Sequence, residues 1–152
     1  MRVSTQFPIA VHALMMLAYF PEERITSEIV AQSVGCNPVI VRNLFVKLKR
    51  AGLLSVKAGR GKMELARPAG KISLWDIYVA AEACKADEIF KFQANASDDC
   101  PVGCNLRKIL FSHLDDAVTA MRDELSGTTL EDLERELETL TGTSAHIFPV
   151  SG

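Results

Sequence analysis

Four cysteines are the residues in this 152-residue chain best suited to redox or metal chemistry: Cys36, Cys84, Cys100 and Cys104. The opening residues lack the apolar core of a secretory signal, so the sequence predicts a cytoplasmic protein. In that compartment cysteines are reduced, catalytic, redox-sensing or metal-bound rather than paired in structural disulfides. No apolar stretch approaches the roughly 20 residues of a membrane span, so no membrane association is expected.

The pair Cys100 and Cys104 brackets Pro101-Val102-Gly103. Proline is favoured at the first position of a helix, so we expect Pro101 to open one. The two thiols would then lie one turn apart near the positive end of the helix, which lowers thiol pKa values. A disulfide at this spacing would strain a regular helix. The pair predicts a thiol switch that loosens the first turn, and small buried packing residues are the alternative.

Basic side chains form the second chemically informative group. Between Cys36 and Arg67 the sequence has eight Lys or Arg residues and a single acid, Glu64. Residues 1–70 carry ten Lys and Arg against four Asp and Glu, whereas residues 71–152 carry seven against fifteen. A basic first half beside an acidic second half indicates a nucleic-acid-binding face in the first half.

Three helices are expected to position this basic group. The first covers about residues 6–19, and the second begins after the N-cap residue Thr26 and ends at Gly35. The third follows Asn37, a further N-cap residue, and its inward face is predicted at helical spacing. The residues of that face are Val41, Leu44, Phe45 and Leu48. Two short helices joined by a tight glycine-containing turn are typical of a helix-turn-helix.

The first turns of the third helix are the candidates for reading bases in the DNA major groove. Arg pairs well with guanine and Asn with adenine, so Arg42 and Asn43 are predicted to contact bases, together with Val39. Lys47 and Arg50 lie further along the helix and are predicted to contact phosphates, which position a protein on DNA without specifying sequence.

A β-hairpin is expected directly after the third helix. Two strand-like runs, residues 53–56 and 63–66, flank a basic glycine-rich tip at residues 57–62. A hairpin in this position is a wing, and Arg60 at its tip is placed to enter a DNA minor groove. The DNA-binding candidates of the wing are Lys57, Arg60 and Lys62.

The second half is expected to pack on a partner through a long helix. A fourth helix starts at Ser73, with Asp76 completing a short capping box. A long helix then runs from about Pro101 or Cys104 to Ser126, and its near-heptad apolar stripe predicts packing on a partner helix. The predicted dimerisation residues are Leu106, Leu110, Leu114, Ala117, Met121 and Leu125. A final helix follows, with Thr128 and Glu131 predicted as its capping box.

In their order and spacing, these pieces resemble the Rrf2 family of bacterial winged helix-turn-helix regulators over roughly residues 1–140. The resemblance implies a homodimer on a palindromic operator that represses or activates a small set of genes. The family's third helix often has an acidic residue where this chain has Arg42, so the resemblance implies no particular operator sequence. The matching segments are Ser4, residues 39–53, Gly59-Arg60-Gly61, and residues 65–68, 72–77 and 100–106.

The resemblance also adds an iron–sulfur cluster as an alternative role for the cysteines. Cluster-binding members place three cysteines close together before the long helix. Here Cys84, Cys100 and Cys104 are separated by fifteen and then three residues, and the family also has members without a cluster. We therefore expect no cofactor and no metal site, with a cluster-dependent sensor as the alternative.

The sequence as a whole predicts a mainly α protein with a winged helix-turn-helix domain, a β-hairpin wing and a long dimerisation helix. The expected division is a DNA-binding domain at 1–83, a cysteine-containing loop at 84–103, dimerisation helices at 104–140 and a tail at 141–152. The expected function is a homodimeric repressor that binds double-stranded DNA and responds to redox state. A winged-helix module for protein–protein contacts is the other alternative. The sequence has no P-loop, dinucleotide fingerprint or catalytic-triad layout, so no enzyme is expected.

Overall fold

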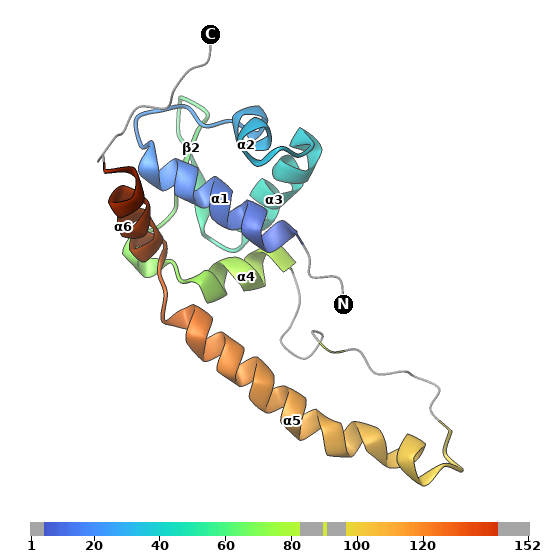
Figure 1. Cartoon of the computed structure of the whole chain (residues 1–152). Coiled ribbons are helices and arrows are strands. Elements are labelled where there is room, and N and C mark those ends of the chain that lie inside the picture. Colours follow the sequence, from blue (N-terminus) through green and yellow to red (C-terminus); the bar gives the residue numbers. More distant parts are fainter. Residues whose placement is uncertain (1–4, 83–89, 91–96, 143–152) are drawn as a thin grey trace.

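The fold is mainly helical, with one small antiparallel sheet, in the part of the chain that the computed structural model describes: residues 5–82, 90 and 97–142. This confirms the predicted fold class (Figure 1). The elements are α1 (Gln6–Tyr19), α2 (Ser27–Val34), α3 (Pro38–Arg50), β1 (Leu54–Lys57), β2 (Lys62–Leu65), the 3₁₀ turn η1 (Ala69–Lys71), α4 (Leu74–Glu82), α5 (Pro101–Ser126) and α6 (Leu130–Thr141).

Helix α1 is the central element of the core. Its residues Ala10, Ala13 and Leu14 are completely buried, and it packs against α3, α4 and α6. Two of those three residues are alanines, whose small side chains let the neighbouring helices approach closely. Helix α1 therefore connects the helix that carries the basic group with the last helix of the described chain (Figure 1).

Helices α2 and α3 form the predicted helix-turn-helix. The Thr26 hydroxyl accepts a hydrogen bond from the backbone N–H of Ile29 at 3.3 Å, which caps α2. Gly35 ends α2 with a φ of 80°, a left-handed conformation that glycine adopts without strain. The Asn37 side chain then caps α3, and the chain bends by 118° between the two helices. This bend lies in the range typical of a helix-turn-helix.

The wing is a two-stranded hairpin, as predicted. Strands β1 and β2 pair from Leu54 opposite Leu65 to Lys57 opposite Lys62. The tip is shorter than the expected six residues, because Lys57 and Lys62 themselves belong to the strands. Gly59, with a φ of 81°, and Gly61, with a φ of 58°, allow this tight turn around Arg60.

Helix α6 folds back onto the winged domain. The backbone N–H of Leu130 donates to the Ile72 carbonyl, and that of Leu74 to the Thr128 carbonyl, both at 2.9 Å. Helix α6 packs against α1 and η1, and Leu130 is completely buried in the core. Apart from Thr141, helix α6 lies within the segment predicted as dimerisation helices, residues 104–140. In the structure it packs on one side of the winged domain.

Of the two capping boxes predicted in the second half of the chain, the structure confirms the first and shifts the second. Ser73 and Asp76 form the predicted box at the start of α4, with bonds of 3.0 and 3.1 Å. The box predicted for the last helix at Thr128 and Glu131 was wrong by one residue, since Thr129 and Asp132 form it. The physical reason is a β-bridge between Ser73 and Thr129, which keeps the backbone extended through Thr129.

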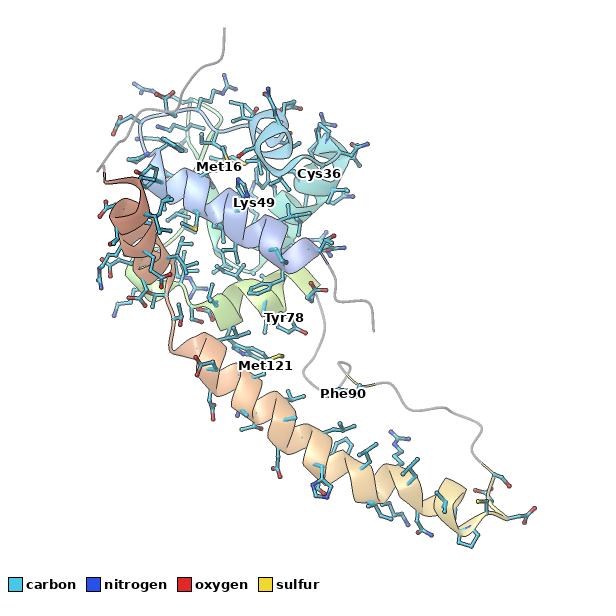
Figure 2. The ribbon with its side chains drawn as sticks, in the orientation of Figure 1. Met16, Cys36, Lys49, Tyr78, Phe90 and Met121 are labelled. Carbon is cyan, nitrogen blue, oxygen red and sulfur yellow. The ribbon has the colours of Figure 1, made fainter. Side chains whose placement is uncertain are left out.

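Helix α5 projects away from the winged domain (Figure 1). Its 26 residues correspond to a length of about 39 Å. The part near α4 packs on the domain: Val118 is buried, and Figure 2 shows Met121 on the side that faces α4. The first part, from Pro101 to Phe111, is exposed apart from the half-buried Gly103. Within the described ranges, no single helix is long and apolar enough to cross a membrane.

Candidate nucleic-acid interface

Helix α3 has two opposite faces. Its inward residues Val41, Leu44, Phe45 and Leu48 are at most 4% exposed and belong to the core. The residues between them follow at 100° steps around the helix and lie at the surface. The exposed residues are Val39, Ile40, Arg42, Asn43, Val46, Lys49 and Arg50, of which Figure 2 labels Lys49. Opposite the side that anchors it, helix α3 therefore presents basic and polar side chains together with the exposed aliphatic residues Val39, Ile40 and Val46.

Arg42 is held by an acidic residue that the sequence did not indicate. Its Nη2 atom lies 2.6 Å from Oε1 of Glu28, in the first turn of α2, and both side chains are more than half exposed. The second carboxylate oxygen of Glu28 accepts a hydrogen bond from the Ser27 hydroxyl at 3.0 Å. Mainly because of the Arg42 hydrogen bond, and also its own backbone N–H, the pKa of Glu28 falls to about 2.

We expect the Glu28 carboxylate to titrate with a midpoint near 2 instead of 4.5, because its charged form is bonded to Arg42. A lowered pKa in the folded state means that the ion pair stabilises the protein above pH 4.5 and is lost as the pH falls toward 2. Carboxyl-carbon NMR during a pH titration measures this midpoint. Arg42→Met should raise it toward 4.5, whereas Lys49→Met should leave it in place. A midpoint near 4.5 in the wild type would contradict the pair.

Two of the predicted DNA-binding lysines bond to the protein itself. The Lys47 ammonium donates to Oε1 of Gln6 at 2.6 Å and to the Ala81 carbonyl at 3.0 Å, so it joins α3 to α1 and α4. The Lys62 ammonium donates to the Pro21 carbonyl at 2.5 Å and ties the wing to the loop after α1. In this structure both ammonium groups support the arrangement of α3 and the wing.

The other basic candidates point into solvent. Arg50, Lys57 and Arg60 are exposed, and their side chains make no hydrogen bond or ion pair to another described residue. Asn43 is likewise exposed beside Arg42. These side chains can therefore meet an external polyanion without first breaking an internal contact, and their DNA-binding role stays a prediction.

The exposed apolar surface of α5 is broader than the predicted stripe. Leu106 and Leu110, which the spacing indicated, are 47% and 37% exposed. Ile109 and Val102, at 62% and 65%, extend the same surface, whereas Phe111, at 49%, is exposed on nearly the opposite side from Ile109. Sequence spacing missed Ile109 and Val102 because a strict heptad stripe is narrower than the apolar surface of this helix.

The rest of the predicted stripe lies nearer the winged domain. Leu114, Met121 and Leu125 are half-buried, and Ala117 is exposed. The buried Val118 lies among them, in the part of α5 that packs on α4. Apolar residues of this part of the helix therefore serve the fold of a single chain, whereas Leu106 and Leu110 stay exposed among the residues that the structure describes.

Cys100 and Cys104 lie at the start of α5, one turn apart as predicted. Cys100 is the N-cap residue, and its carbonyl accepts the N–H of Cys104 at 3.0 Å. Hydrogen bonds from the backbone N–H groups of Gly103 and Val102 lower the pKa of the Cys100 thiol. Both thiols are exposed. This arrangement favours a thiolate at Cys100 with a second thiol close by.

The remaining cysteines differ in position. Cys36 is half-buried at the turn between α2 and α3 and packs against the core, and Figure 2 labels it there. Cys84 lies outside the described residues. Within the described ranges, no three His, Cys, Asp or Glu side chains are grouped closely enough to hold a metal ion. Of the three cysteines considered as cluster ligands, the structure therefore places Cys100 and Cys104.

Comparisons with known proteins agree with this fold. Residues 3–136 match the family model Rrf2, described as iron-dependent transcriptional regulator. YwnA of Bacillus subtilis (strain 168), named as an HTH-type transcriptional regulator, is 32% identical over 135 residues, which cover 89% of this chain and 98% of YwnA.

Solved structures give the same result. The oxidized form of Staphylococcus aureus CymR has a TM-score of 0.61 at 26% identity and covers 88% of this chain and 96% of its own. T. potens IscR has a TM-score of 0.66 at 24% identity, with coverages of 92% and 90%, which supports the fold.

Proposed function

This chain belongs to the Rrf2 family of transcriptional regulators, and we propose that it binds DNA as a homodimer on a palindromic operator and acts as a repressor. No enzymatic role is expected of such a regulator, which agrees with the sequence analysis. The proposed regulator contacts DNA through α3 and the wing, dimerises through α5, and responds to a chemical signal.

The DNA contact rests on the exposed face of α3. This helix is anchored by a fully apolar side and turned by 118° from α2, so its opposite side is available to a major groove. Arg42 and Asn43 carry the donor groups that distinguish guanine and adenine there. Arg50 and the wing residues Lys57 and Arg60 add positive charge for the phosphate backbone and the minor groove.

The dimer rests on the exposed apolar start of α5. A helix with Leu106, Ile109 and Leu110 exposed on one side gains free energy when a second copy covers them. Two winged domains related by a two-fold axis would read two half-sites about one helical turn apart. A dimer bound across a promoter would exclude RNA polymerase by occupancy, and this is the mode of repression that we propose.

We expect Arg60→Ala to weaken binding to a duplex selected from a random library by about tenfold and to reduce its salt dependence by about one phosphate contact. Fluorescence anisotropy across a salt series measures both quantities. Arg122→Ala, which removes an exposed Arg from α5, should change neither. Failure of the wild type to bind any duplex, together with strong binding to a protein partner, would favour the interaction-module alternative.

The signal is proposed to be thiol oxidation at the start of α5. The Cys100 thiolate attacks a low-molecular-weight disulfide and releases one of its thiols, and Cys104 then displaces the other thiol to close the intramolecular disulfide. The bond between the Cys104 N–H and the Cys100 carbonyl must loosen, because a regular helix strains a disulfide at this spacing. Oxidation would thereby alter the part of α5 that joins the dimer.

Cys100 is expected to be alkylated by iodoacetamide faster than Cys104 or Cys36 at neutral pH, because backbone N–H groups stabilise its thiolate. Peptide mass spectrometry over a time course gives the three rates, and the half-buried Cys36 serves as the internal reference. Equal rates at Cys100 and Cys104 would contradict the assignment. Stoichiometric iron and sulfide after anaerobic purification would instead favour the cluster-based alternative.

A further inference from the structure

The ion pair between Glu28 and Arg42 connects the two helices of the helix-turn-helix at the base-contacting end of α3. We propose that Glu28 is a positioning residue that sets base specificity, because it directs the Arg42 guanidinium at a guanine and withholds it from phosphates. This inference rests on the proposed DNA-binding function and adds to it a residue that does not itself touch a base.

The Glu28 carboxylate is fixed at both oxygens. Oε1 accepts from Nη2 of Arg42 at 2.6 Å, and Oε2 accepts from the Ser27 hydroxyl at 3.0 Å. Glu28 also lies in the first turn of α2, where the positive end of the helix favours a negative charge. A carboxylate held in this way fixes the direction of the guanidinium that it binds.

The bound guanidinium keeps enough donors for a base. An arginine has five N–H donors in a planar fork, and the bond to Glu28 uses one hydrogen of Nη2. Nη1, Nε and the second Nη2 hydrogen remain for the two acceptors of guanine, O6 and N7. Because one Nη2 hydrogen is already bonded to Glu28, less side-chain freedom is lost when the guanine is bound.

The carboxylate also reduces attraction to DNA of any sequence. An unpaired Arg42 would be drawn to phosphates everywhere, whereas a paired one brings a nearly neutral group to the duplex. The Glu28 carboxylate is ionised at physiological pH, so its charge is present when the protein meets DNA. Specificity is a difference between affinities, so weaker binding to unrelated sequences raises it as effectively as stronger binding to the operator.

The experiment is a selection of bound duplexes from a random library with four full-length proteins: wild type, Glu28→Ala, Arg42→Ala and the double variant. The wild type is expected to prefer guanine at one position of each half-site. Glu28→Ala should reduce that preference by about tenfold, which is the discrimination that a bidentate Arg–guanine contact provides. It should also raise the affinity for unrelated duplexes. In the Arg42→Ala background, Glu28→Ala should cause no further change at that position.

Matched variants separate positioning from fold and from net charge. Glu28→Gln, which keeps an acceptor oxygen, should retain part of the guanine preference. Glu22→Ala removes a different exposed acid and should leave the preference intact, and thermal unfolding should show all variants folded.

Two results would overturn the inference alone: an unchanged base preference in Glu28→Ala while Arg42→Ala loses it, or an equal effect of Glu28→Ala with and without Arg42. A wild type that enriches no duplex would overturn the proposed function, and the inference with it.

Discussion

Leu110→Asp is expected to convert the protein to a monomer and to lower its affinity for a palindromic operator by about 1,000-fold. Leu110 lies in the exposed apolar part of α5, between Ile109 and Phe111. A carboxylate there would have to be desolvated against a partner helix, which is costly without a compensating charge. A monomer can occupy only one half-site of the operator. It therefore loses the binding free energy that the second half-site contributes to the nanomolar affinity of the dimer.

Light scattering measures the mass, and anisotropy on the selected operator measures the affinity. The matched control is Lys108→Asp, two residues before Leu110 and therefore on nearly the opposite side of the helix. This control should stay dimeric and bind normally. A wild type that is monomeric at micromolar concentration, or a Leu110→Asp variant that stays dimeric, would show that this surface of α5 is not the dimer interface.

Leu130→Ala is expected to lower the free energy of unfolding by about 2–5 kcal/mol, the usual cost of truncating a fully buried leucine. Leu130 is completely buried although it is the first residue of the last helix. Its loss would leave a cavity where α6 meets the core and weaken the attachment of that helix. Chemical denaturation followed by circular dichroism measures the change.

Leu140→Ala, in the same helix, is the control for this prediction. Leu140 is 85% exposed, so its truncation should change the free energy of unfolding by no more than about 0.5 kcal/mol. Similar losses for both variants would mean that α6 is stabilised by its own helical structure and not by packing on the core.

The helix boundaries in the first half were predictable because local residues determine them. Thr26, Gly35 and Asn37 act within one turn of their own positions, and the structure confirms each as a cap. The last capping box was misplaced because a distant residue decides it. The bridge from Ser73 to Thr129 spans more than fifty residues, and no local pattern reveals it.

In the candidate interface, too, some features depend on local sequence and others on residues far away in the chain. The exposure of Arg42, Asn43 and Arg50 follows from helical periodicity alone. The partners of Lys47 and Lys62, however, come from other elements and depend on how those elements pack. A count of basic residues treats all these cations alike, whereas the fold assigns some of them to its own stabilisation.

The pairing of Glu28 with Arg42 was missed for a related reason. The two residues are fourteen positions apart, on helices that meet at an angle set by the turn between them. Periodicity within one helix cannot show this contact. Given the helix-turn-helix geometry, an acidic residue in the first turn of α2 would have been the signal.

Helix α5 is attached to the winged domain at one end, where α6 folds back, and its first turns lie about 39 Å away. Such a helix acts as a lever arm with its pivot at α4. From Val118, where α5 packs on α4, to Pro101 the helix is about 26 Å long, so a rotation of only 10° displaces the far end by roughly 4.5 Å, more than the 3.4 Å rise of a DNA base pair. The thiols are therefore at the end where a small angular change produces the greatest travel.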